Sequence, residues 1–175
     1  MDYKRLFLLV EGDDDERFIK QIITPLFEEN YKYIKPWKYS QKKKNKIRSF
    51  IKSIKSMKAS FIFFHDFNKA NCYTQRLEKL TETYSLIARS DIIVVRMEIE
   101  GWYLAGLSDS DGLGLGLNEI GSTDNTTKED FNSVIPRDFD SRIDFMNEVL
   151  MYFSIDVAKD RNASFSYFLS KYLKL

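Results

Sequence analysis

Cysteine, histidine and long hydrophobic runs are scarce in this chain of 175 residues, and each scarcity excludes a class of protein. Cys72 is the only cysteine, so no disulfide can form within the chain, and nothing indicates an oxidising compartment. The first apolar run, residues 6–10, is too short for a signal peptide, and no run reaches the roughly 20 residues of a membrane-spanning helix. His65 is the only histidine and no nucleophile-elbow motif accompanies it, which argues against a Ser-His-Asp hydrolase. We therefore expect a cytoplasmic protein that does not associate with membranes.

Acidic residues are missing from residues 31–65. This segment holds eleven of the 27 Lys and Arg of the chain and none of its 26 Asp and Glu, although the net charge of the whole chain is only +1. Such a local charge favours contact with the phosphates of DNA or RNA, independent of base sequence, although lysines on a helix also form ordinary solvated surfaces. The residues for which we expect phosphate contacts are Lys43, Lys44, Lys46, Arg48 and Lys52.

Four aromatic residues lie among these lysines. They are Tyr31, Tyr33, Trp37 and Tyr39. They either stack on unpaired bases or pack into the core around a second strand, and the sequence leaves both interpretations open.

Apolar and aromatic residues are plentiful. Hydrophobic residues make up 43% of the chain, with 14 Phe and 10 Tyr, which is enough to build a core, and the length fits one domain over residues 1–175. Apolar runs at residues 5–10, 33–39, 59–64 and 91–97 predict strands, and helical spacing between them predicts helices from Asp13, over 43–57 and over 70–88. This alternation predicts an α/β fold with a parallel sheet of about four strands flanked by helices.

Local patterns refine this scheme. Asp13 is expected to cap the first helix with Glu16 as its capping-box partner, and Pro25 to kink or end its last turn. Pro36 indicates that the second strand is an edge strand or irregular. The inner face of the helix over 43–57 is expected to consist of Ile47, Phe50, Ile51 and Ile54.

The C-terminal part is expected to be helical. A short helix over 98–105 precedes residues 107–126, whose Gly, Ser, Asp and Asn predict a loop, with the glycines at 112, 114 and 116 suiting a lid. Apolar stripes over 143–153 and 165–173 predict a helical extension over about residues 127–175. Arg161 and Ser164 open the last helix, where they either bind an anion or, in the case of Ser164, cap the helix.

Two of the expected strands end in acidic residues. Glu11 directly follows the first strand, and Asp66 follows the run at 59–64 after His65. Ligands of open parallel sheets bind beyond the carboxyl ends of the strands, so neighbouring strands would bring Glu11 and Asp66 together. Paired carboxylates at this edge suit a hard cation such as Mg²⁺. His65 is expected to support Asp66 or to pack at the strand end.

Several short motifs resemble one family. Residues 10–15, Val-Glu-Gly-Asp-Asp-Asp, are similar to the start of Toprim domains, and residues 66–68, Asp-Phe-Asn, occupy the place of their D-x-D signature. Residues 98–104, Glu-Ile-Glu-Gly-Trp-Tyr-Leu, resemble the later acidic motif of Toprim nucleases of the overcoming-lysogenisation-defect type. Residues 161–165, Arg-Asn-Ala-Ser-Phe, are similar to the end of small stand-alone microbial Toprim-like proteins. The resemblance implies a Toprim-like core over about residues 5–105.

The resemblance also implies roles for single residues. Glu11 would be the general acid/base, and Mg²⁺ or Mn²⁺ would be the cofactor. The residues that would form the metal shell are Glu11, Asp15, Asp66, Asn68 and Glu100, with Glu98 less favoured than Glu100. Asn68 departs from the second Asp of the signature; its carbonyl oxygen can ligate a metal but adds no charge. The acidic run at 13–16 has a structural explanation as well, because carboxylates cap helices and complement the helix dipole.

Two functions are expected from these observations. The first is a Mg²⁺-dependent Toprim-like nuclease, or another enzyme that acts on the phosphodiesters of DNA or RNA. The alternative is a non-catalytic Toprim-like module that binds nucleic acid or a partner protein in a defence or toxin-type system. Hydrolysis of a small phosphate ester is a third option, and the sequence leaves open whether the chain forms a homodimer.

Overall fold

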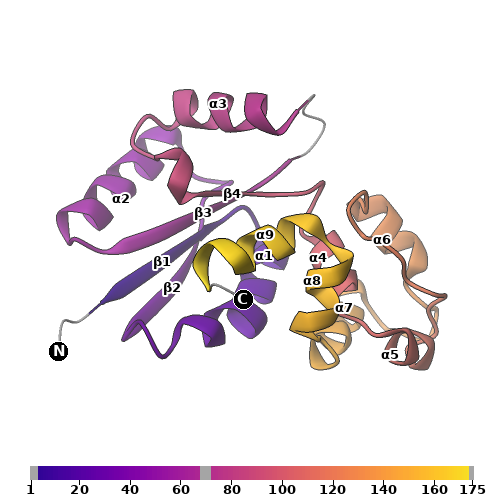
Figure 1. The fold of residues 1–175 in the computed structure, drawn as a ribbon. Helices are drawn as coiled ribbons and strands as arrows, with labels where there is room; N and C mark the ends of the chain where they lie inside the picture. Colours follow the sequence, from indigo (N-terminus) through magenta and orange to yellow (C-terminus); the bar gives the residue numbers. More distant parts are fainter. Residues whose placement is uncertain (1–3, 68–71, 174–175) are drawn as a thin grey trace. The chain divides into compact units, whose positions relative to one another are not determined.

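A parallel sheet organises the N-terminal half of the chain. The computed structural model describes residues 4–67 and 72–173. The strands are β1 (Arg5–Val10), β2 (Tyr33–Lys38), β3 (Ser60–Asp66) and β4 (Ile92–Val95). They lie in the order β2-β1-β3-β4 and are all parallel (Figure 1). The predicted α/β fold is therefore confirmed, and β2 is the edge strand that Pro36 indicated.

The chain divides into two compact units, Met1–Val94 and Val95–Leu175. The first unit contains the sheet apart from the last residue of β4, and the second is helical. The single Toprim-like domain that the sequence predicts, with a core over residues 5–105, crosses this boundary and stays a prediction.

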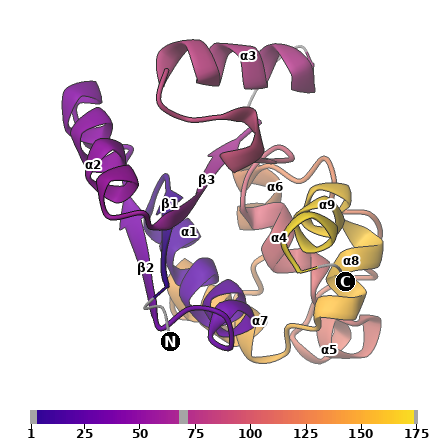
Figure 2. The ribbon, with the colours of Figure 1, turned by 60° about the vertical axis from the view of Figure 1, so that its left-hand side comes forward.

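Helices cover both faces of the sheet in the first unit. They are α1 (Asp13–Phe18), which continues through the π-helical turn η1 (Ile19–Ile23) and the 3-10 turn η2 (Thr24–Phe27), α2 (Lys44–Ser56), α3 (Tyr73–Thr83) and the short 3-10 turn η3 (Arg89–Asp91). Figure 2 shows α2 and α3 on one side of the sheet and α1 on the other. Because β1 is central and covered on both faces, Leu6 to Val10 are all buried, which explains their unbroken apolar run.

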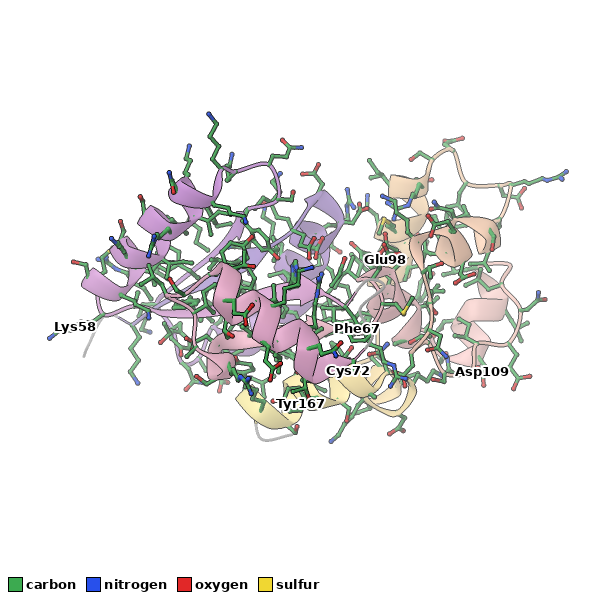
Figure 3. All side chains as sticks on the ribbon, turned by 90° about the horizontal axis from the view of Figure 1, so that it is seen from above. Lys58, Phe67, Cys72, Glu98, Asp109 and Tyr167 are labelled. Atoms are coloured by element: carbon green, nitrogen blue, oxygen red, sulfur yellow. The ribbon has the colours of Figure 1, made fainter. Side chains whose placement is uncertain are left out.

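The face of the sheet that α2 and α3 cover carries a large apolar cluster. Phe7 and Leu9 of β1 and Phe63 of β3 pack there with Ile47 and Ile51 of α2. Ile54 is buried as well and Phe50 is half-buried against this cluster, so the predicted inner face of α2 is confirmed. α3 is shorter than the helix predicted over 70–88, and exposed Cys72 caps it by accepting a hydrogen bond from the backbone N–H of Gln75 (Figure 3).

The start of α1 differs from the prediction by one residue. Gly12 is the N-cap, and its backbone N–H donates to Oδ2 of Asp15 at 3.1 Å. The prediction that Asp13 caps the helix with Glu16 was therefore wrong. In the turn after β1 the Asp15 carboxylate lies against the backbone N–H of Gly12. Asp13 and Glu16 instead form ion pairs with Nζ of Lys38 of β2, at 2.5 and 3.2 Å respectively.

The second unit consists of six helices within the described part of the chain. These are α4 (Glu100–Ala105), α5 (Asp109–Gly114), α6 (Lys128–Val134), α7 (Arg142–Met151), α8 (Ile155–Arg161) and α9 (Ala163–Tyr172). The helical C-terminal region is therefore confirmed. The stretch 107–126 is not all loop, because Ser108 caps α5 by accepting from the N–H of Asp111 and the helix includes Gly112 and Gly114. Ile143 is 52% exposed and does not belong to the buried stripe predicted for α7.

None of the helices described for residues 4–67 and 72–173 is long and apolar enough to cross a membrane.

Candidate functional site at the ends of β1 and β3

The strand order defines where a ligand of this sheet would bind. The chain leaves β1 for β2 on one side and then returns for β3 on the other side, so the strand order reverses between β1 and β3. In open parallel sheets the crevice at such a reversal, outside the carboxyl ends of the strands, is the usual ligand site. Glu11 follows the last residue of β1, and Asp66 is the last residue of β3, so both predicted acidic residues lie at this edge.

Glu11 and Asp66 are in direct contact, through a side chain and a main chain. Oε1 of Glu11 accepts a hydrogen bond from the backbone N–H of Asp66 at 2.9 Å, across 55 residues of sequence. The backbone carbonyl of Asp66 is held in turn by Arg76 of α3, whose Nε and Nη2 donate to it at 3.1 and 2.9 Å. The end of β3 is therefore fixed from both sides, by a carboxylate from β1 and a guanidinium from α3.

His65 contacts Glu11 and Tyr39 at the end of β3, where the sequence left open whether it would support Asp66 or pack at the strand end. Nδ1 of His65 lies against Oε1 of Glu11 and 2.7 Å from the hydroxyl of Tyr39. This hydroxyl has one proton, which it donates to the carbonyl of Phe64 at 2.8 Å, so the network assigns a proton to Nδ1 of His65. Alternation along β3 sends the side chains of His65 and Asp66 to opposite faces of the sheet, which explains why His65 meets Glu11.

The surroundings of Glu11 keep its carboxylate charged. Burial raises the pKa of Glu11, but the hydrogen bond and charge of His65, the N–H of Asp66 and the charge of Arg76 together lower this pKa below its ordinary value. Burial first, and then the negative charge of Glu11, Asp15 and Asp66, raise the pKa of Tyr39 well above the usual range. At neutral pH the site therefore presents an ionised Glu11 beside a protonated Tyr39.

A small pocket opens beside Glu11. It has a volume of about 200 Å³, and its lining includes Glu11, Gly12, Ser40 and two lysines, Lys38 and Lys42. Lys38 is paired with Asp13 and Glu16, which raises its pKa. A phosphate group in this pocket would thus meet the cation of Lys42 close to the candidate carboxylate.

Asp15 and Asn68 are the two remaining residues of the predicted metal shell that belong to the first unit. Asp15 is buried, with 7% of its surface exposed, and it serves the start of α1 through its bond to Gly12. Asn68 lies outside the described residues. The structural explanation that the sequence allowed for the acidic run at 13–16 therefore applies to Asp15.

Glu100 belongs to the second unit and has a structural partner there. It is 4% exposed and forms an ion pair with Arg142 at 2.6 Å. The same guanidinium donates through Nε to Asn132 at 2.7 Å. Glu98, labelled in Figure 3, accepts a hydrogen bond from the backbone N–H of Lys128 at 2.5 Å, at the start of α6. Both acidic residues of the later motif thus hold the helices of this unit in place.

Two motifs far apart in the sequence meet in the core of the second unit. Trp102 donates through its indole N–H to Oγ of Ser164 at 2.8 Å, and the backbone N–H of Arg96 donates to the same oxygen at 3.0 Å. Asn162, not Ser164, is the cap of α9. A Cβ on Gly101 would lie 2.9 Å from the carbonyl oxygen of Thr123, so this position requires glycine for close packing.

These contacts correct the anion-binding interpretation of the last helix. Arg161 binds the carbonyl of Leu107 and forms an ion pair with Asp109 at 2.5 Å. Ser164 is buried and engaged with Trp102 and the backbone of Arg96. Neither side chain is directed at a solvent-exposed helix end, so both are explained by packing.

The basic segment forms an exposed surface on α2. None of the predicted contact residues has an ion pair with another residue of the part of the chain that the structure describes, so their charges are uncompensated. These residues are Lys43, Lys44, Lys46, Arg48 and Lys52, and all five are exposed. Tyr39 of the aromatic set is core, and Trp37 stacks on Phe50 with ring centroids 4.1 Å apart.

Whether a metal ion fits this edge depends on the ligands that water and a phosphate substrate would add to those of the protein. Among residues 4–67 and 72–173 there is no group of three or more His, Cys, Asp or Glu placed to hold one. Mg²⁺, however, often uses one or two protein carboxylates and takes its other ligands from water and phosphate. The ionised Glu11 carboxylate suits such a site, although His65 and the backbone N–H of Asp66 already contact one of its oxygens.

Comparison with known proteins gives no match to a family, to a curated protein or to a solved structure. Arg76 was missed from sequence, and Tyr39 was considered only as a base-stacking or core residue, not as a partner of His65 at the Glu11 site. Tyr39 directly follows β2, so it reaches the same sheet edge as Glu11, and this position was a usable signal. Arg76 is one of several cations in its region, and its role is visible only from the packing of α3.

Proposed function

We propose that this chain is a Toprim-like enzyme that acts on the phosphodiesters of DNA or RNA with Mg²⁺ or Mn²⁺, most simply as a nuclease. One observation supports the proposal above all: the ionised Glu11 carboxylate meets the end of β3 at Asp66, at the strand-order reversal of a parallel sheet. Carboxylates at such an edge suit chemistry on an anionic phosphodiester only when a cation accompanies them.

Each residue of the site has a defined part in this proposal. Glu11 and Asp66 would hold the cation, which when bound stabilises charge on the phosphate and lowers the pKa of a water. His65 and Tyr39 orient the Glu11 carboxylate, and Arg76 holds the backbone of Asp66. Lys42 and the exposed cations of α2 dock the phosphate backbone, so affinity for nucleic acid should fall steeply with salt.

A nuclease assay tests the proposal directly. Glu11→Gln and Asp66→Asn should each abolish cleavage of labelled DNA or RNA in Mg²⁺ or Mn²⁺, whereas Glu29→Gln, which removes an exposed acid elsewhere in the first unit, should leave it unchanged. Mn²⁺ titration by calorimetry should give a heat of binding that Glu11→Gln reduces. Full activity in both site variants would refute the assignment of Glu11 and Asp66.

A second candidate function has its own supporting observation. Oε1 of Glu11 is already engaged by His65 and by the N–H of Asp66, an arrangement that also suits a purely structural carboxylate. A non-catalytic module would bind nucleic acid through α2 or bind a partner protein. It would show no heat with Mg²⁺ and the same affinity for nucleic acid with and without a chelator.

A further inference from the structure

We propose that a pocket between α2 and residues 82–86 is a subsite for one nucleotide of a single-stranded nucleic acid. The inference rests on the proposed function, because it specifies the substrate of the same edge of the first unit. The pocket has a volume of about 260 Å³ and is separate from the pocket at Glu11.

The lining of this pocket combines the two kinds of surface that a nucleotide requires. Cationic Lys44 and Arg48 of α2 stand on its rim, and buried Ile51 with half-buried Tyr84 and Leu86 supply an apolar wall. The guanidinium of Arg48 lies 3.5 Å from the hydroxyl of Ser85, so the rim joins α2 to the segment after α3. Asn45, Thr83 and Ser85 add neutral hydrogen-bonding groups, and Glu82 is the one acid among the lining residues.

The occupant follows from this chemistry. Lys and Arg bind phosphate without regard to base sequence, and an aromatic ring beside them stacks on any unpaired base. A duplex keeps its bases stacked inside, so it could offer only phosphates to Lys44 and Arg48 and would leave Tyr84 unused. The combination of cations with an aromatic and apolar wall therefore favours a single strand over a duplex.

Aromatic rings connect the pocket to the candidate catalytic edge. The ring of Tyr84 lies 6.5 Å from that of Tyr39 and 5.2 Å from that of Phe63, centroid to centroid. Tyr39 and Phe63 lie in turn 6.2 and 6.0 Å from the ring of His65, which contacts Glu11. The rings of Tyr39, Phe63 and His65 thus lie between Tyr84 of the pocket and Glu11, so the pocket and the candidate catalytic carboxylate belong to the same part of the first unit.

Binding measured in a chelator tests the subsite without any cleavage. Fluorescence anisotropy of labelled single-stranded and duplex oligonucleotides should show that Tyr84→Leu weakens single-strand affinity by about tenfold and leaves duplex affinity within about twofold. Tyr84→Phe keeps the ring and should bind as the unmodified protein does, and the retained duplex affinity of Tyr84→Leu shows that this variant is folded. Arg48→Gln should weaken single-strand binding more than Lys55→Gln, which removes the same charge from α2 outside the pocket.

The outcomes separate this inference from the proposed function. Equal single-strand affinity of Tyr84→Leu and the unmodified protein, or equal loss for the duplex, would overturn the subsite even if Glu11→Gln abolishes cleavage. Cleavage that persists in Glu11→Gln and Asp66→Asn would overturn the proposed enzyme, while a selective loss of single-strand binding in Tyr84→Leu would still support the subsite.

Discussion

The carboxylate of Glu11 and the backbone N–H of Asp66 are joined by a hydrogen bond of 2.9 Å that ties the end of β1 to the end of β3. Glu11 therefore has two separable properties, an oxygen that accepts this bond and a negative charge that faces His65. Substitutions that keep one property and remove the other distinguish its structural role from its chemical role.

Glu11→Gln and Glu11→Ala should differ in stability but not in activity. Gln keeps an acceptor for the Asp66 N–H and should lower the free energy of unfolding by about 1 kcal/mol, whereas Ala leaves that half-buried N–H without this acceptor and should lower it by about 2 kcal/mol. Urea unfolding measures the difference, and the nuclease assay should show no cleavage in either variant. Equal stability of both variants would mean that the bond to Asp66 contributes nothing.

The lowered pKa of Glu11 predicts a specific pH dependence of stability. A carboxylate whose pKa is lower in the folded state than its ordinary value of 4.5 stabilises the fold above that value, and this contribution is lost as pH falls through the folded-state pKa. The free energy of unfolding should therefore fall below about pH 4.5, and less so in Glu11→Gln.

Urea unfolding of both proteins at pH 7 and at several values below 4.5 measures this difference. Glu16 and Asp130 also have lowered pKa values, so the unmodified protein and Glu11→Gln both lose some stability in acid. Only the difference between their free energies of unfolding is due to Glu11. A difference in free energy of unfolding between the two proteins that stays constant down to the lowest pH would contradict the prediction.

Glu100 should behave as the buried half of a partly buried ion pair in the second unit. Arg142→Met removes this cation from the buried Glu100 carboxylate and should lower the free energy of unfolding by about 3 kcal/mol, whereas Glu100→Gln leaves the half-buried Arg142 in contact with water and should lower it by less. Fluorescence of Trp102 reports on this unit in a Trp37→Phe background. If Glu100 were instead a metal ligand, Glu100→Gln would reduce the heat of Mn²⁺ binding and Arg142→Met would not.

Lys58 should be replaceable by glycine with a gain in stability. It follows the C-cap of α2 with φ of 52°, and the backbone bonds Lys58 N–H to Lys55 O and Ala59 N–H to Ile54 O form a Schellman motif. Lys58→Gly removes the strain of a left-handed residue and should raise the free energy of unfolding by about 0.5–1 kcal/mol.

Lys55→Gly, inside the same helix, should lower the free energy of unfolding by about 1 kcal/mol and serves as the matched control. Figure 3 shows Lys58 directed away from the ribbon, so the change removes no packing contact. A loss of stability in Lys58→Gly would show that the turn tolerates lysine without strain.

Much of the first unit could be predicted from the sequence, because the patterns concerned are local. An unbroken apolar run such as Leu6 to Val10 indicates a strand covered on both faces, and Ile47, Ile51 and Ile54 mark one face of a helix whatever they pack against. Pro36 cannot donate a backbone hydrogen bond, which by itself favoured an edge strand. Even the approach of Glu11 to Asp66 followed from the rule that parallel strands end at the same edge.

The partners of the charged and polar side chains were decided only by the tertiary structure. Asp15, not Glu16, accepts from the N-cap backbone of α1, His65 meets Glu11 and Tyr39, and Glu100 pairs with Arg142. The sequence shows none of these choices. The physical reason is direction: strand register and helix rotation set where a side chain points, and a one-residue step reverses the face of a strand. The spacing of residues along a chain therefore determines which elements form, whereas the partner of a given carboxylate depends on the packing of elements far apart in sequence.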